Sequence, residues 1–83
     1  MPALQASYVQ AWQNLFVNAQ NIKGKNAVLK IYDLNGRIVY SSSQKTQPPY
    51  FTQDVDVSGL SSGMYIVSLE TEREVLNKKF VKN

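Results

Sequence analysis

Apolar and polar residues alternate along several short segments of the chain, a pattern typical of β-strands that bury one face. In segment 51–57 the phenylalanine and valine side chains fall on one side, and Thr52, Asp54 and Asp56 fall on the other. Segment 64–71 carries apolar side chains on both sides. We therefore expect segment 64–71 to be a central strand.

Segment 31–40 predicts a β-hairpin, because two β-prone runs flank the residues Asp33–Gly36. The Asp33 carboxylate can accept a hydrogen bond from the backbone two residues further on. Gly36 can adopt the left-handed conformation that closes a three-residue loop with a bulge. Asp33 and Gly36 are therefore interpreted as structural turn residues.

The form of this turn decides the strand register. In the bulged form Ile31 faces Val39, whereas a two-residue type I′ turn at positions 35–36 would place Ile31 opposite Tyr40. We favour the bulged form. It gives a buried face of Leu29, Ile31 and Val39, and a second face of Lys30, Tyr32, Ile38 and Tyr40.

The remaining segments also favour strands and loops. Residues 7–19 predict two short strands broken at positions 13–14; a helix over 4–17 is the alternative, which the β-branched and aromatic content disfavours. Segment 41–49 has few apolar residues and ends in two prolines, so we expect it to be the longest and most mobile loop. Leu60 is expected to plug one end of the core, and a last strand over 75–81 places Leu76 and Phe80 on one face.

Seven short strands separated by turns predict an all-β domain, an antiparallel β-sandwich of immunoglobulin-like type. With 83 residues the chain has room for one core and no deep cleft. It contains no histidine and no cysteine, which excludes disulfides, thiol nucleophiles and the usual zinc ligand sets. We expect no cofactor, no metal site and no enzymatic activity.

The net charge of +3 is too small to argue for binding to nucleic acid. No apolar run approaches the roughly 20 residues that a transmembrane helix needs, and no signal segment opens the chain. We expect residues 1–83 to be a single domain from the end of a larger protein.

Three groups of side chains are weaker candidates for chemistry. Asp54 and Asp56 share one strand face and could bind calcium, but without a third ligand we interpret them as a charged, exposed surface. The acidic trio at positions 70, 72 and 74 is interpreted as a solvated turn. An aromatic platform for sugars or bases is possible in principle. Its members would be Tyr8, Trp12, Phe16, Tyr32, Tyr40 and Tyr50, which we interpret instead as core or cross-strand residues.

Three segments carry a resemblance to a known family. They are the hairpin 31–39, the segment 55–67 that reads VDVSGLSSGMYIV, and the closing residues 78–83 that read KKFVKN. In this order and spacing they resemble the type A C-terminal sorting domains of cargo proteins of the type IX (Por) secretion system of Bacteroidetes. The chain differs at its front, where Pro2–Val9 replaces the Tyr-Pro-Asn-Pro type opening of many members.

The resemblance implies a β-sandwich at the end of a secreted cargo protein. Such a domain is recognised by the outer-membrane translocon, shuttle and sortase components after transit through the periplasm. The sortase commonly removes it as the cargo is released or attached to lipopolysaccharide at the cell surface. The resemblance therefore implies that the domain is a targeting signal and not a catalyst.

We place the export signal in the hairpin from Gly63 to Asn83. The candidate recognition residues are Gly63, Tyr65, Lys79, Phe80, Val81 and Lys82. Tyr65 and Phe80 are expected in the core, and both lysines are expected to be solvated. The alternative function is a free-standing β-sandwich module that binds carbohydrate or an adhesion partner.

Overall fold

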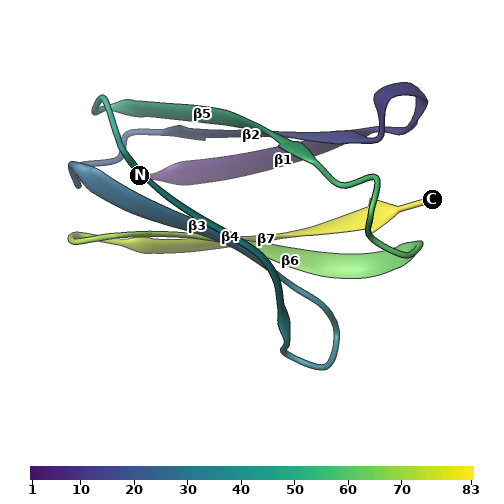
Figure 1. Cartoon of the computed structure of the whole chain (residues 1–83). Helices are drawn as coiled ribbons and strands as arrows, with labels where there is room; N and C mark the ends of the chain where they lie inside the picture. The colour runs from purple at the N-terminus through teal and green to yellow at the C-terminus, as the bar shows by residue number, and fades with distance from the viewer.

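Two antiparallel sheets pack face to face in the computed structural model, which describes all 83 residues (Figure 1). The elements are β1 (Ala3–Val9), the 3-10 turn η1 (Gln10–Trp12), β2 (Asn14–Gln20), β3 (Asn26–Tyr32), β4 (Ile38–Lys45), β5 (Tyr50–Asp56), β6 (Gly63–Thr71) and β7 (Val75–Lys82). One sheet has the order β1-β2-β5 and the other β4-β3-β6-β7. The predicted all-β sandwich is confirmed, and β6 is a central strand as expected.

The N-terminal segment forms strands and not the alternative helix. The first strand starts earlier than predicted, at Ala3, and η1 interrupts the chain before Gln13. Gln13 has a left-handed backbone with φ of 53°, and its N–H donates to the Gln10 carbonyl at 3.2 Å. The second strand then begins at Asn14, so the break spans residues 10–13 and includes Gln13 of the predicted break.

The turn between β3 and β4 has the predicted bulged form. The Gly36 N–H donates to the Asp33 carbonyl at 3.1 Å, and the Asp33 N–H donates to the Arg37 carbonyl at 3.0 Å. Gly36 has a φ of +82°, whereas Asn35 needs no positive φ. The Asp33 Oδ1 accepts the backbone N–H groups of Asn35 at 2.9 Å and Arg37 at 3.0 Å.

The register beyond this turn differs from the prediction. Tyr32 pairs with Ile38 as expected, but Ile31 pairs with Tyr40 instead of Val39. The cause is a second irregularity: Val39 is an extra residue in β4, and such a bulge moves every later residue of the strand to the opposite face. Tyr40 therefore packs against the core, and its hydroxyl accepts a hydrogen bond from Gln53 Nε2 at 2.8 Å.

The predicted long loop at 41–49 is also wrong, because β4 continues to Lys45 and only residues 46–49 connect it to β5. The serines of this segment belong to an exposed edge strand, whose polar side chains resemble those of a loop. Ser42 and Gln44 meet Gln53 of the other sheet through side-chain hydrogen bonds. This polar cluster closes one side of the sandwich.

The core fills the space between the two sheets. Leu60 packs against it from the loop between β5 and β6, as predicted. The buried apolar residues come from six of the seven strands and from the two connecting loops at 21–25 and 57–62. They are Leu4, Leu15, Val17, Ala19, Ile22, Ala27, Leu29, Ile31, Phe51, Val55, Val57, Tyr65, Val67, Leu69 and Phe80.

Candidate functional site

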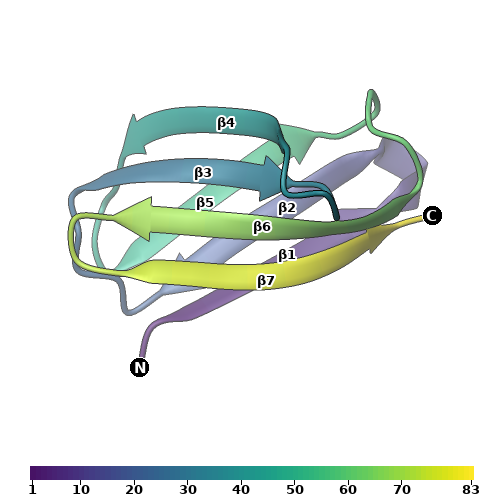
Figure 2. The same cartoon turned by 90° about the horizontal axis from the view of Figure 1, so that it is seen from below.

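The six recognition residues predicted from the sequence all lie in one half of the β6–β7 hairpin. Antiparallel pairing sets Gly63 opposite Lys82, and the next two pairs are Met64–Val81 and Tyr65–Phe80. One step further, Ile66 pairs with Lys79. Strand β7 is the edge of its sheet, beside the central strand β6 (Figure 2). The hairpin therefore assembles these residues, but it divides them between its two faces.

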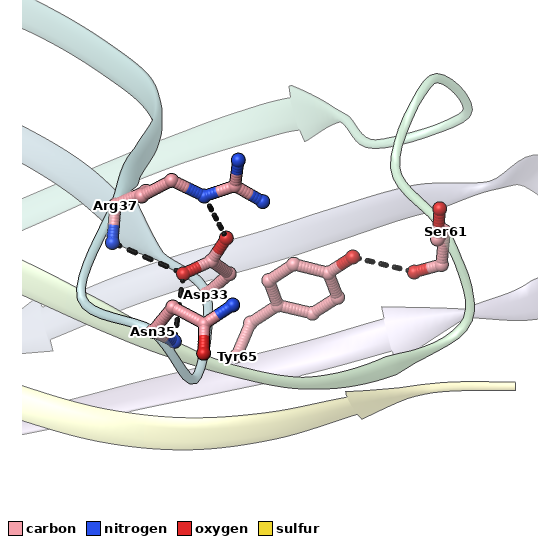
Figure 3. A network of polar contacts seen from close by, with 5 residues as sticks. All are labelled: Asp33, Asn35, Arg37, Ser61 and Tyr65. Atoms are coloured by element: carbon pink, nitrogen blue, oxygen red, sulfur yellow. Dashed lines mark hydrogen bonds and ion pairs between the residues drawn. The ribbon is translucent and has the colours of Figure 1, made fainter.

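Tyr65 and Phe80 face the core, as predicted. Their rings stack with centroids 5.4 Å apart and an interplanar angle of 21°. The Tyr65 hydroxyl donates to the Ser61 carbonyl at 2.5 Å, which ties the hairpin to the loop between β5 and β6 (Figure 3). The pair thus fixes both the strands and the neighbouring loop.

Lys82 was expected to be solvated, and this prediction is wrong. The residue is only 5% exposed. Its Nζ donates to the carbonyls of Val57 at 2.8 Å and Ser58 at 3.5 Å, and also to that of Leu60. Strand alternation explains the burial, because Lys82 lies two residues beyond Phe80 and so points to the same inner face. Counting this alternation from Phe80 would have found it.

The loop that receives Lys82 is further shaped by its own residues. The Asp56 carboxylate accepts the Ser58 N–H at 2.9 Å, and this backbone hydrogen bond lowers the pKa of Asp56. Gly63 ends the loop with a φ of +152°, which side-chain-bearing residues rarely adopt. We call this region, with residues 33–37, 57–62 and Lys82, the Lys82 end of the sandwich.

Lys79 and Val81 lie on the outer face of the hairpin, away from the other sheet. Both are exposed, as expected for Lys79. Pairing across the four strands places further apolar side chains beside them, in a cluster that the sequence alone does not predict. We call this cluster the outer patch; it consists of Tyr32, Ile38, Met64, Ile66 and Val81. Its members come from three separate segments, so only the strand register reveals it.

The acidic trio lies at the opposite end of the hairpin, where Glu72 is exposed to solvent and Glu70 and Glu74 are half-buried. Two of its carboxylates also have a structural role that was not predicted. The Glu74 carboxylate accepts the N–H groups of Lys23 at 2.8 Å and Gly24 at 3.3 Å, and also the Thr71 hydroxyl. The side-chain hydrogen bond from Thr71, followed by these backbone bonds, lowers the pKa of Glu74. We call this region, with residues 21–26 and 71–74, the Glu74 end.

Glu72 makes a similar connection at the Glu74 end. It accepts both the backbone N–H and the side-chain Nδ2 of Asn26, each at 2.9 Å. Led by the backbone bond from Asn26, these interactions lower the pKa of Glu72 to about 2. Glu70 instead forms an ion pair with Lys30 at 3.8 Å. Two of the three glutamates therefore hold a distant loop in place.

The weaker chemical candidates do not come together. Asp54 and Asp56 are exposed, and no group of three or more acidic, histidine or cysteine side chains could hold a metal ion. Trp12 and Phe16 form an edge-to-face pair at 6.1 Å, whereas Tyr8 and Tyr40 pack against the core. The structure contains no helix that is long and apolar enough to cross a membrane.

Comparison with known proteins gives one match. Residues 11–83 match the family described as the secretion system C-terminal sorting domain. The match begins within η1 and includes strands β2 to β7, so β1 lies outside it. No curated protein and no solved structure matches the chain.

Proposed function

Because the chain belongs to the family of secretion system C-terminal sorting domains, which are type IX secretion signals, we propose that its β6–β7 hairpin directs an attached cargo through the outer membrane. The family is not a family of enzymes. The observation that carries the proposal is the match over residues 11–83, which contains the whole hairpin. The partners are the secretion machinery and a cargo domain in the same polypeptide.

The two faces of the hairpin suggest two separate roles, folding for the inner residues and recognition for the outer ones. Tyr65, Phe80 and Lys82 are buried and hold the strands and the 57–62 loop together. Lys79 and Val81 are exposed and are free to touch another molecule. We therefore assign recognition to the outer residues and assign the inner ones to keeping the signal folded.

We further infer that a sortase removes the domain after transit from the periplasm. The cargo is then released or attached to lipopolysaccharide at the cell surface. This inference is supported by the family resemblance of segments 31–39, 55–67 and 78–83. A size shift of the exported cargo on a denaturing gel, lost when the sortase is inactivated, is the expected sign of cleavage.

The test of the sorting function is a fusion of residues 1–83 behind a signal peptide and a fluorescent protein in a type IX-competent bacterium. We expect the fluorescent cargo on the cell surface or in the medium. The same fusion without residues 1–83, and the intact fusion in cells whose translocon is inactivated, should remain in the periplasm. Retention of the intact fusion in competent cells would refute the proposal.

Deletion of residues 79–83 is a poor test of which residues the machinery reads. The deletion removes Phe80 and Lys82 from the interior as well as Lys79 from the surface. Reversing the charge of Lys82 has the same defect, because it would place a carboxylate against backbone carbonyls. Only variants of the outer face separate recognition from unfolding.

A further inference from the structure

We propose that the outer patch is the surface through which the machinery holds the folded domain, and that its partner is an apolar protein surface with a carboxylate opposite Lys79. This inference rests on the proposed sorting function and assigns its recognition surface. It is carried by the residues that strand pairing places on the outer face of the four-stranded sheet. Figure 2 shows the order of the four strands.

The patch occupies two neighbouring rows of that face. The longer row crosses all four strands, and its members in order are Ile38, Tyr32, Ile66 and Lys79. The shorter row is the pair Met64–Val81. Ile38 is 53% exposed and Val81 is 51% exposed, so the apolar surface is open to solvent. A contiguous apolar cluster of this kind is typical of an interaction site, whereas single exposed apolar residues are not.

Other large apolar side chains, including Trp12, Leu34, Tyr50 and Val75, are also exposed, but they lie outside the two rows of the patch. The next row of the same face is polar, with the order Ser41, Lys30, Ser68, Asn77. On the outer face of the other sheet, Phe16 lies between Ser7 and Asp54, and the neighbouring row is Gln5, Asn18 and Thr52. The two sheets share one core through their inner faces. Folding therefore does not explain why the outer face of the four-stranded sheet carries apolar rows.

The charge on the patch indicates the chemistry of the partner. Lys79 is the charged residue of the two rows, it is exposed, and it forms no ion pair within the chain. A carboxylate at the rim of an apolar partner surface would complement it. A second copy of the patch would not complement Lys79, because its two rows contain no carboxylate. Glu70 lies elsewhere on the same outer face and is paired with Lys30. An anionic membrane attracts clusters of basic residues, whereas this patch contains a single basic residue, Lys79.

The experiment uses the fluorescent fusion with residues 1–83 intact and a matched pair of substitutions. Val81→Asp places a charge in the patch, and Val75→Asp does the same outside it. Val75 lies on the same strand and the same outer face, opposite Glu70, and is 59% exposed. We expect Val81→Asp, and separately Ile38→Asp, to lower export at least tenfold. Val75→Asp should export like the unmodified fusion.

Thermal unfolding of each purified chain separates docking from folding. If Val81→Asp unfolds at the same temperature as Val75→Asp but is not exported, the patch is a recognition surface. Equal export of the two variants would overturn the inference while leaving the sorting function intact. Retention of the unmodified fusion would instead count against the sorting function itself, so the two failures are distinguishable.

Two further arms test the nature of the partner. Lys79→Glu should reduce export severalfold, whereas Lys78→Glu, which changes an exposed lysine that is not on the outer face, should not. A dimer in sedimentation equilibrium that Val81→Asp abolishes would identify the patch as a contact between copies and overturn the inference. Co-sedimentation with anionic lipid vesicles that depends on Val81 would overturn it in favour of a membrane surface.

Discussion

At both the Lys82 end and the Glu74 end of the sandwich, charged side chains form hydrogen bonds to a backbone loop. The sign of the charge and its burial differ between the two ends. At the Lys82 end a buried ammonium donates to the carbonyls of residues 57, 58 and 60. At the Glu74 end carboxylates accept the N–H groups of residues 23, 24 and 26. The two connections span about 25 and about 50 residues of sequence, respectively.

The two ends also differ in how far their hydrogen bonds are buried in the interior of the protein. Lys82 lies on the same inner face as Phe80, and its hydrogen bond to the Val57 carbonyl is buried, while those to Ser58 and Leu60 are partly buried. Water therefore replaces this donor less readily than it would at an exposed site. Glu72 is exposed, so water can replace the groups that it binds. The end that carries the outer patch is therefore the one that is tied to the core.

The largest expected effect comes from removing an aromatic ring at the Lys82 end. Phe80→Ala or Tyr65→Ala should lower the free energy of unfolding by about 3 to 5 kcal/mol, because each leaves a cavity and breaks the stacked pair. Urea denaturation followed by circular dichroism measures the loss. Val75→Ala, at an exposed position of the same hairpin, is the control. A loss below about 1 kcal/mol at either aromatic position would show that this end is not anchored in the core.

Lys82→Met tests the ammonium itself and should cost about 1 to 3 kcal/mol. The Ser58 and Leu60 carbonyls lose the Lys82 donor, and the Val57 carbonyl keeps only the Leu60 N–H. Lys79→Met, an exposed lysine on the same strand, should change stability by less than about 0.5 kcal/mol. Denaturation of the two variants in parallel gives the comparison. Equal small losses would mean that the Lys82 hydrogen bonds contribute little to the fold.

The turn at the Lys82 end offers a smaller and more local effect. Gly36→Ala should cost about 1 to 2 kcal/mol, because alanine is strained at a φ of +82°. Asn35→Ala should cost less, because Asn35 has no positive φ and its side chain is not required by the turn (Figure 3). Thermal or urea denaturation distinguishes the two. Large and equal losses would contradict the bulged turn.

Acid should destabilise the Glu74 end locally, because protonation of Glu72 and Glu74 weakens their hydrogen bonds to the 21–26 loop. The folded state lowers the pKa of Glu72 to about 2 and also lowers that of Glu74, so both favour folding when they are ionised. Their contribution is complete above the unfolded pKa of about 4.5 and is lost as the pH falls from there towards 2. We expect the amide protection factors of Lys23, Gly24 and Asn26 to decrease over this range.

Glu74→Gln provides the control for the acid prediction. It should lower the protection of Lys23 and Gly24 already at neutral pH, because a neutral amide is a weaker acceptor than a carboxylate. The amides of β6 should keep their protection in the same sample. Loss of protection at both places together would indicate global unfolding and contradict a local role for Glu74.

The smallest expected effect is the response to metal ions. Asp33, Asp56, Glu72 and Glu74 already accept hydrogen bonds from the chain, and no acidic cluster is arranged around a common point. Calorimetric titration with calcium and with zinc should therefore show no binding at micromolar affinity. The unmodified chain is the sample, and a chelator-treated aliquot is the reference. Heat that saturates at one ion per chain would refute this.

Local patterns in the sequence were enough to predict the elements whose signals are local. Alternation predicted the central strand β6 and the inward placement of Tyr65 and Phe80, because a strand turns successive side chains to opposite faces. Asp33 and Gly36 predicted the bulged turn, because that turn requires an acceptor and a left-handed residue within four positions. The hairpin that carries the proposed recognition residues was predictable for the same reason.

Tertiary structure decided whatever depends on residues that are far apart in the chain. The extra residue at Val39, which itself packs against the core as predicted, reversed the faces of β4 from Tyr40 onward, and nothing nearby in the sequence marks it. The burial of Lys82 depends on a loop some 25 residues earlier, and the role of Glu74 depends on a loop about 50 residues away. The outer patch exists only because strand pairing places Ile38, Tyr32 and Ile66 in one row and Met64 and Val81 in the next. The energy of such contacts depends on register and packing, which the alternation of a single strand does not contain.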